Sequence, residues 1–309
     1  MAGPATEAGV VSERPADDAP LTIGVVSPGA MGSALGRAWQ AAGARVLATV
    51  DGRGERTRSL AHGLELVADL DAVVAASDVV VSVVPPGAAT DTMAAILDSA
   101  RRGGVTPLVA DLNAISPVAV RDLGALAESA GHAFVDGAIS GGPPAAGGDT
   151  VLYLSGQHAA VLAEVTADGL RTRVVGDEPG TASAVKMCTA SVYKGTTALW
   201  AQALQTAYAH GVLDVVLDDL AEELPGAAAT AGRRIAVATS KSARFVAEME
   251  QIADTQGAAG ASRELFAGMV AVYARLARTP LAALSPEEAR DLTDLEDVLA
   301  RLAPGRQPP

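Results

Sequence analysis

The stretch Gly24-Val-Val-Ser-Pro-Gly-Ala-Met-Gly32 decides the fold of this chain, because it joins a short apolar segment to a helix through a glycine-rich turn. Residues 21–26 are rich in β-branched side chains, which favours a strand, and residues 31–42 repeat apolar side chains at helical spacing. In such turns the first glycine makes the bend, the second lets backbone N–H groups approach a pyrophosphate, and the third allows close helix–strand packing. The sequence therefore predicts a dinucleotide-binding turn.

This turn departs from the usual pattern at its first position. Gly29 and Gly32 fill the second and third glycine positions, whereas Ser27 fills the first and is followed by Pro28. A small residue beside a proline of fixed φ can still turn the chain, and a helix N-terminus favours phosphate. The same residues also suit a tight loop without a ligand, since the chain has 32 glycines. The residues that we expect to bind the cofactor are Ser27, Pro28, Gly29, Ala30, Met31 and Gly32.

The loop that follows the second predicted strand, residues 45–50, bears on the choice of cofactor. It reads Asp51-Gly-Arg-Gly-Glu-Arg-Thr-Arg58 and lies about 20 residues after the turn, where such domains bind the adenosine ribose. A carboxylate there suits the ribose hydroxyls of NAD, whereas guanidinium groups suit the 2′-phosphate of NADP. We expect NADP, bound by Arg53, with NAD as the alternative. The arginines also suit a solvated loop in which they pair with Asp51 and Glu55.

Composition excludes several classes of function. The 309 residues are 49% hydrophobic and 19% charged, as in a globular chain long enough for two domains. The net charge of −13 disfavours a nucleic-acid partner, because phosphate contacts need basic patches. A single cysteine excludes an internal disulfide and disfavours a zinc site, so we expect no metal. Without a long apolar run or a signal peptide, the chain is expected to be cytoplasmic, with no membrane partner.

The order of the patterns predicts two domains between two tails. Residues 21–179 alternate apolar strands with helices, as in an α/β Rossmann-type doubly wound parallel sheet. Residues 180–303 carry only helical patterns, beginning with a long helix over residues 181–210, and should form an all-α domain. Residues 1–20 are predicted to be a disordered tail, and residues 304–309 a second tail.

Three strand ends of the predicted sheet are expected to face the ligands, because ligands lie beyond the carboxyl ends of parallel strands. Val84 and Pro85 should lie beside the cofactor, and Asn113 should bond either the substrate or the nicotinamide amide. Ser140, followed by Gly141 and Gly142, offers a hydroxyl and two backbone N–H groups to a substrate carboxylate, since glycine permits close approach.

Four motifs in this order resemble the β-hydroxyacid dehydrogenase superfamily, which includes 3-hydroxyisobutyrate dehydrogenase and 6-phosphogluconate dehydrogenase. Its cofactor motif matches residues 24–32, and its nicotinamide-side proline loop resembles residues 78–86. Its Asp-x-Ser-Thr-x-x-Pro loop resembles residues 111–117, with Asn-Ala in place of Ser-Thr, and its substrate loop matches residues 136–142, with Ala138 in place of proline. The resemblance implies hydride transfer between NADP(H) and a small hydroxyacid or semialdehyde.

A fifth motif of the superfamily implies which residue moves the proton. Its Gly-x-Gly-x-x-x-Lys segment begins the long interdomain helix, and Gly180-Thr-Ala-Ser-Ala-Val-Lys186 occupies that place here. The resemblance therefore implies that Lys186 is the catalytic acid/base; an ammonium group there also stabilises negative charge on the reacting oxygen. The polar pair that normally follows is Thr189-Ala190 here. Thr189 and Tyr193 can share a helical face with Lys186, and we expect both to contact substrate.

The late segment Phe245-Val-Ala-Glu-Met-Glu250 is similar to a bacterial subgroup of this superfamily whose C-terminal helical domain is known as DUF1932. Two other functions stay open. An imine reductase shares this architecture but usually has Asp or Tyr where Lys186 stands, and a non-catalytic NADP-binding regulator fits the loss of the polar pair. A helical domain attached through one long helix has more apolar surface than the cofactor domain alone can cover, so we expect a homodimer.

Overall fold

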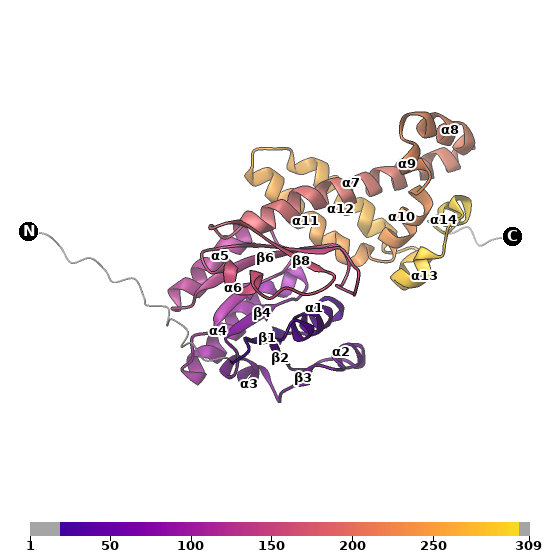
Figure 1. The fold of residues 1–309 in the computed structure, drawn as a ribbon. Helices are drawn as coiled ribbons and strands as arrows, with labels where there is room; N and C mark the ends of the chain where they lie inside the picture. The colour runs from indigo at the N-terminus through magenta and orange to yellow at the C-terminus, as the bar shows by residue number, and fades with distance from the viewer. Residues whose placement is uncertain (1–18, 303–309) are drawn as a thin grey trace, which may run out of the picture. The chain divides into compact units, whose positions relative to one another are not determined.

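The computed structural model describes residues 19–302, and the tails expected over residues 1–20 and 304–309 lie outside the described residues except for Ala19 and Pro20. The chain divides into two compact units, Met1–Lys186 and Met187–Pro309 (Figure 1). The division falls inside the long helix, so Lys186 belongs to the same unit as the sheet.

The N-terminal unit is built on an eight-stranded sheet with strand order β3-β2-β1-β4-β5-β6-β7-β8. Its strands are β1 (Thr22–Val26), β2 (Arg45–Ala48), β3 (Glu65–Leu66), β4 (Val79–Ser82), β5 (Leu108–Asp111), β6 (Phe134–Ser140), β7 (Thr150–Ser155) and β8 (Leu170–Gly176). The first six strands pair in parallel, in the order of a dinucleotide-binding sheet. β7 pairs antiparallel with β6, and β8 runs parallel to β7. The sheet is therefore mostly parallel, as expected, and only β7 and β8 run in the opposite direction.

Helices cover both faces of this sheet, because successive strand residues point to opposite sides. They are α1 (Ala30–Ala41), α2 (Glu55–Leu60), α3 (Leu70–Ala75), the short 3-10 helix η1 (Pro86–Ala88), α4 (Ala89–Gly103), α5 (Pro117–Ser129) and α6 (Ala159–Ala163). On one face, Ile23 of β1 packs in a cluster with Leu35 and Trp39 of α1. On the other, Val80 of β4 packs with Met93 of α4. Burial of these side chains holds the strands in place, and with them the strand ends at which we expect the ligands to bind.

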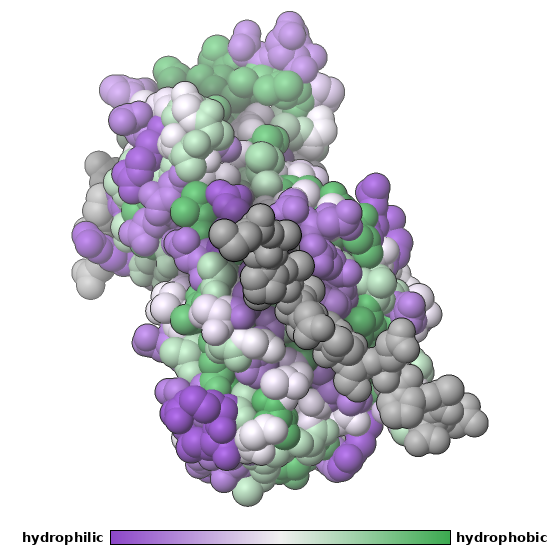
Figure 2. Space-filling model, turned by 90° about the vertical axis from the view of Figure 1, so that its left-hand side faces the viewer, coloured by the Kyte–Doolittle hydropathy of each residue, from purple (hydrophilic) through white to green (hydrophobic). Residues whose placement is uncertain are grey.

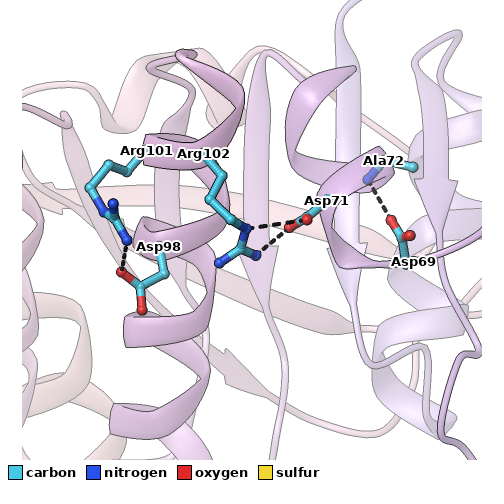
Figure 3. Close-up of polar contacts among 6 residues, drawn as sticks. All are labelled: Asp69, Asp71, Ala72, Asp98, Arg101 and Arg102. Carbon is cyan, nitrogen blue, oxygen red and sulfur yellow. Dashed lines mark hydrogen bonds and ion pairs between the residues drawn. The ribbon is translucent and has the colours of Figure 1, made fainter.

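Exposed polar contacts join two helices of this unit (Figure 3). The Asp69 carboxylate accepts a hydrogen bond of 2.8 Å from the Ala72 N–H and so caps α3. Arg102 of α4 pairs with Asp71 of α3 at 2.5 Å, and the Arg102 hydrogen bond holds the pKa of the Asp71 carboxyl below its usual value. Because the side chains are exposed, salt weakens this pair, and it contributes to helix positioning rather than to the core.

The C-terminal unit contains helices and no strand within its described residues, as the sequence predicts. Its helices are α7 (Thr181–Ala209), which begins in the N-terminal unit, then α8 (Leu213–Glu223), α9 (Pro225–Ala228), α10 (Ala231–Thr239), α11 (Ser242–Ala258), α12 (Arg263–Leu276), the 3-10 helix η2 (Pro280–Ala283), α13 (Pro286–Arg290) and α14 (Leu295–Leu302). The fully buried side chains of Ile235, Met249 and Tyr273 mark its core. These three residues come from α10, α11 and α12, so burial joins elements far apart in the sequence.

Apolar side chains also reach the surface, and Figure 2 shows hydrophobic residues interspersed with hydrophilic ones over the face that it draws. On α7, Val192, Tyr193 and Leu199 are each at least 60% exposed. No helix within residues 19–302 is long and apolar enough to cross a membrane.

Candidate active site

The glycine-rich turn bends as its sequence requires, although a serine stands at the first glycine position. Ser27 has a φ of 63° and is the only residue other than glycine with a positive φ in the described part of the chain. The left-handed conformation costs a residue with a Cβ about 1–2 kcal/mol. Strained backbone of this kind persists where the surrounding structure enforces it, and it is concentrated at functional sites.

The N-terminus of α1 presents backbone donors beside this bend. The Gly29 N–H donates to the Ser27 carbonyl at 2.7 Å, and no side chain caps the helix. The N–H groups of Ala30 and Met31 have no hydrogen-bond partner among residues 19–302. A Cβ on Gly29 would meet no atom within 4 Å, whereas one on Gly32 would lie 3.0 Å from the Ser27 carbonyl oxygen. Gly32 therefore allows the close helix–strand packing, and the space beside Gly29 leaves the donors accessible to a phosphate.

The loop expected at the adenosine ribose carries three exposed arginines. Arg53, Arg56 and Arg58 lie between the end of β2 and the middle of α2. They form no ion pair with Asp51 or Glu55 in the described chain, so the pairing considered as an alternative for this loop is not present.

Asn113 joins the ends of β4 and β5 through a buried hydrogen-bond network. Its Oδ1 accepts a bond of 2.6 Å from the Val84 N–H, and its Nδ2 donates to Ser82 Oγ at 2.9 Å and to the Asp111 carboxylate at 2.6 Å. These bonds position the loop at Val84 and Pro85. The contact with substrate or nicotinamide that the sequence predicted for Asn113 stays a prediction, and the structure assigns the side chain an internal role as well.

Asp111, which the sequence analysis did not single out, is fully buried at the centre of this network. Burial raises the pKa of the Asp111 carboxyl to about 7, against the effect of the two hydrogen bonds from Asn113. The charge of Asp136, the residue paired with Asp111 on β6, adds to the rise. The sequence signal was an acidic residue at the end of an apolar strand.

Asp136 anchors the helix that carries Lys186. One of its carboxylate oxygens accepts bonds from the Gly180 N–H at 2.8 Å, the Ser183 N–H at 3.1 Å and Ser155 Oγ at 2.9 Å. The other accepts from Ser183 Oγ at 2.7 Å. A fully buried negative charge therefore caps the N-terminus of α7, where the helix dipole favours it. The sequence analysis gave Asp136 no role, although it is an acidic residue inside a buried strand.

Gly180 can make this connection because it lacks a side chain. Its φ is +96°, and a Cβ there would lie 3.0 Å from the Pro117 carbonyl oxygen. The first turn of α7 is thus held against the sheet, and Lys186, half-buried, follows in the second turn. The structure assigns Lys186 and the strand ends to one compact unit.

The predicted substrate residues belong to both units. Ser140 ends β6 and is half-buried, and the exposed Gly141 and Gly142 follow it. Gly141 has a φ of +108°, which favours glycine. Thr189 and Tyr193 lie on the part of α7 that belongs to the C-terminal unit. Within the described residues, no group of three or more His, Cys, Asp or Glu could hold a metal ion.

Comparison with protein families finds two matches along the chain. Residues 22–167 match the NAD binding domain of 6-phosphogluconate dehydrogenase. Residues 207–276 match DUF1932, a domain of unknown function. The two matches occur in the order that the sequence analysis expects.

Solved structures with the same fold support this family. The conserved protein MTH1747, of unknown function and structurally similar to 3-hydroxyacid dehydrogenases, is 30% identical with a TM-score of 0.63, over 83% of this chain and 97% of its own. The 3-hydroxyisobutyrate dehydrogenase of Mycobacterium tuberculosis, solved with L-serine, is 21% identical with a TM-score of 0.64, over 92% and 99%. An imine reductase variant from Myxococcus stipitatus, in complex with NAD+, is 23% identical with a TM-score of 0.53, over 92% and 99%.

At their identities the last two structures show the fold alone, whereas the similarity to MTH1747 extends to the sequence over most of both chains. The chain therefore belongs to the β-hydroxyacid dehydrogenase superfamily, in the group whose NAD binding domain of the 6-phosphogluconate dehydrogenase type is followed by DUF1932.

Proposed function

We propose that this protein is a nicotinamide-dependent oxidoreductase of the 3-hydroxyacid dehydrogenase type, with Lys186 as its general acid/base. It interconverts a small hydroxyacid and the corresponding carbonyl compound. The observation that carries the proposal is the anchoring of the first turn of α7 by Asp136, which holds to the sheet of the cofactor-type domain the helix that carries Lys186 in its next turn. Other described residues fit the binding of the cofactor, the transfer of the proton and the binding of the substrate carboxylate.

The glycine-rich turn fits a pyrophosphate. The N–H groups of Ala30 and Met31 would hold it, and the open space beside Gly29 would admit it. Arg53 would hold the 2′-phosphate of NADP, because a guanidinium group pairs well with phosphate oxygens. The nicotinamide supplies or accepts the hydride when it is bound.

Lys186 supplies the proton chemistry of the reaction. In alcohol oxidation its amine takes the hydroxyl proton, and in carbonyl reduction its ammonium group returns that proton to the oxygen. The ammonium charge also stabilises the negative charge that develops on this oxygen. Ser140 Oγ and the N–H groups of Gly141 and Gly142 hold the substrate carboxylate, since the glycines leave the backbone accessible.

The identity of residue 186 favours this reaction over imine reduction. Imine reductases share the fold, as the Myxococcus stipitatus structure shows. An imine is reduced after its nitrogen has been protonated, and the product is a neutral amine. No negative charge develops on an oxygen in that reaction, so it does not need a cationic group to stabilise one. A lysine at position 186 suits an oxygen that becomes negatively charged.

A turnover panel tests the proposal. The full chain is assayed with NADPH and with NADH against semialdehydes, amino-bearing carbonyls and cyclic imines, and with NADP+ and NAD+ against 3-hydroxyacids. We expect turnover of a hydroxyacid and its semialdehyde, faster with the phosphorylated cofactor. Turnover of cyclic imines alone would instead identify an imine reductase, and cofactor binding without any turnover would identify a regulator.

The enzyme acts as a homodimer in the cytoplasm, with neither nucleic acid nor membrane as its partner. Support for the dimer comes from α7, where Val192, Tyr193 and Leu199 are each at least 60% exposed. A second copy of the chain would cover this apolar surface, and twofold dimers are the commonest assembly of this kind.

A further inference from the structure

The C-terminal unit contains a pocket of about 800 Å³ whose lining is strongly basic. Five of the eleven residues that line it carry a positive charge, and none is Asp or Glu. We call these five residues the basic cluster; they are Lys194, Arg233, Arg234, Lys241 and Arg290. A concentration of positive charge is unusual in a chain with a net charge of −13, so it calls for a physical explanation.

Protein carboxylates neutralise little of the basic cluster. Glu248 is buried; it pairs with Lys194 and also accepts a bond of 3.0 Å from Arg244, which lies beside the pocket. Arg233, Lys241 and Arg290 form no ion pair with a carboxylate within residues 19–302. Most of the positive charge of the cluster is therefore not balanced by an ion pair with a carboxylate of the described residues.

Lys241 experiences the resulting repulsion. It is half-buried, and burial is the largest of the causes that lower the pKa of its ammonium group. The positive charges of Arg244 and Arg290 lower this pKa further, whereas Glu287 and Glu248 oppose the change more weakly. A bound anion would remove this unfavourable repulsion.

Part of the pocket lining is aromatic, and contacts of these rings join them to Lys194. The rings of Phe245 and Tyr273 meet edge to face, with centroids 5.3 Å apart, and the Tyr273 hydroxyl donates to the Lys194 carbonyl at 2.8 Å. The Lys194 ammonium group lies 4.7 Å from the centroid of the Phe245 ring. These contacts join α7, α11 and α12 and hold Lys194, the member of the basic cluster on α7, in place.

We propose that this pocket binds a small molecule that carries two or more clustered oxyanion groups, as in a phosphate ester or a polycarboxylate. Arg233, Lys241 and Arg290 hold its oxygens, because guanidinium and ammonium groups form strong charge-assisted bonds with them. An apolar part of the ligand packs on Phe245. A pocket of this volume suits a small molecule rather than a macromolecule. Tyr193, which we expect to contact substrate, also lines this pocket, but anion binding here does not require hydride transfer.

Calorimetric titration of the full chain with pyrophosphate, and separately with citrate, tests the pocket at fixed ionic strength. Lys241→Met and Arg290→Gln should each weaken binding of the better probe at least tenfold, and the double variant should abolish it. Arg278→Gln is the matched control, because Arg278 is exposed in the same unit and does not line the pocket; its affinity should stay within twofold. Binding of neither probe, or equal losses in the control and pocket variants, would overturn the proposal.

Thermal unfolding separates a binding role from a structural one. Without a probe, Lys241→Met should melt at the same temperature as the unaltered chain or higher, because the substitution relieves repulsion. The probe should raise the melting temperature of the unaltered chain but not that of the variant. A lowered melting temperature without a probe, together with equal stabilisation of both proteins by the probe, would contradict the proposed site. Binding can succeed here even if the turnover panel fails, so the two proposals are tested separately.

Discussion

Individual residues at the strand ends have a strained backbone or a buried carboxyl group. Neither feature is required for a loop that only connects a strand to a helix. Ser27 takes a left-handed conformation, and Asp111 is fully buried beside Asp136. The sequence located Ser27 because it interrupts a glycine pattern, but it gave no sign that two carboxyl groups pair across adjacent strands. Their proximity depends on strand register, which the local sequence does not encode.

Substitution of Ser27 should show that its backbone is strained. Ser27→Val should lower the free energy of unfolding by about 1–2 kcal/mol, because a β-branched side chain tolerates a positive φ poorly. Ser27→Gly should leave it unchanged or higher, since glycine adopts this conformation freely. Urea unfolding measures both variants. Equal losses in the two would show that the serine side chain, and not the backbone, matters at this position.

The raised pKa of Asp111 predicts a particular dependence of stability on pH. Its carboxyl has a pKa of about 7 in the folded chain and an ordinary value of 3.8, so the folded state holds the proton more tightly. The resulting stabilisation is complete below about pH 4 and is lost as pH rises through about 7; a difference of about 3 in pKa corresponds to about 4 kcal/mol.

The comparison with Asp111→Asn isolates this effect from other titrating groups. Urea unfolding at pH 5 and pH 8 should show the unaltered chain losing stability relative to the variant as the pH rises. A difference that stays constant would mean that Asp111 is ionised throughout this range, and one that changes in the opposite direction would contradict a raised pKa of its carboxyl.

Among the elements, those with a strong apolar pattern were predicted well. The long helix expected over residues 181–210 is α7 (Thr181–Ala209), and the strand expected over residues 21–26 is β1 (Thr22–Val26). β3 (Glu65–Leu66) was missed because both of its residues are exposed and leave no apolar pattern. The reversed direction of β7 and β8 was also missed, since strand direction depends on how the connection crosses the sheet.

Asp136 is predicted to fix the first turn of α7. Asp136→Ala leaves the N–H groups of Gly180 and Ser183 without their acceptor, so the free energy of unfolding should fall by about 3 kcal/mol. Ser183→Ala removes a single side-chain bond and should cost about 1 kcal/mol. Asp122→Ala, at an exposed aspartate of α5, is the control and should cost little. A small effect of Asp136→Ala in urea unfolding would remove the anchoring role.

At the scale of the whole molecule, the basic cluster shows what sequence patterns miss. Its members come from α7, α10, the connection between α10 and α11, and α13, and they span residues 194 to 290, so no local spacing brings them together. The arginine-bearing loop after β2, by contrast, lies in one short segment and was located from the sequence. Sites that tertiary packing assembles from distant helices become visible only in the structure.

Assembly of the full chain should be dimeric. Light scattering at micromolar concentration should give a mass twice the 30.9 kDa of one chain. Leu199→Glu should shift this mass toward the monomer, because it introduces a charge into the exposed apolar face of α7. Leu126→Glu, at an exposed leucine of α5, is the matched control and should stay dimeric. A monomer mass for the unaltered chain would exclude the dimer.

The central claim is that Lys186 transfers the proton in a nicotinamide-dependent reaction, and its most direct test is the steady-state turnover of Lys186→Met beside the affinity for the cofactor. We expect kcat to fall by roughly 100-fold or more, because a positioned acid/base contributes at least that much. The dissociation constant for NADPH should stay within a few-fold, since the phosphate-binding turn is intact. Normal turnover by Lys186→Met with the substrate found in the panel would contradict the account.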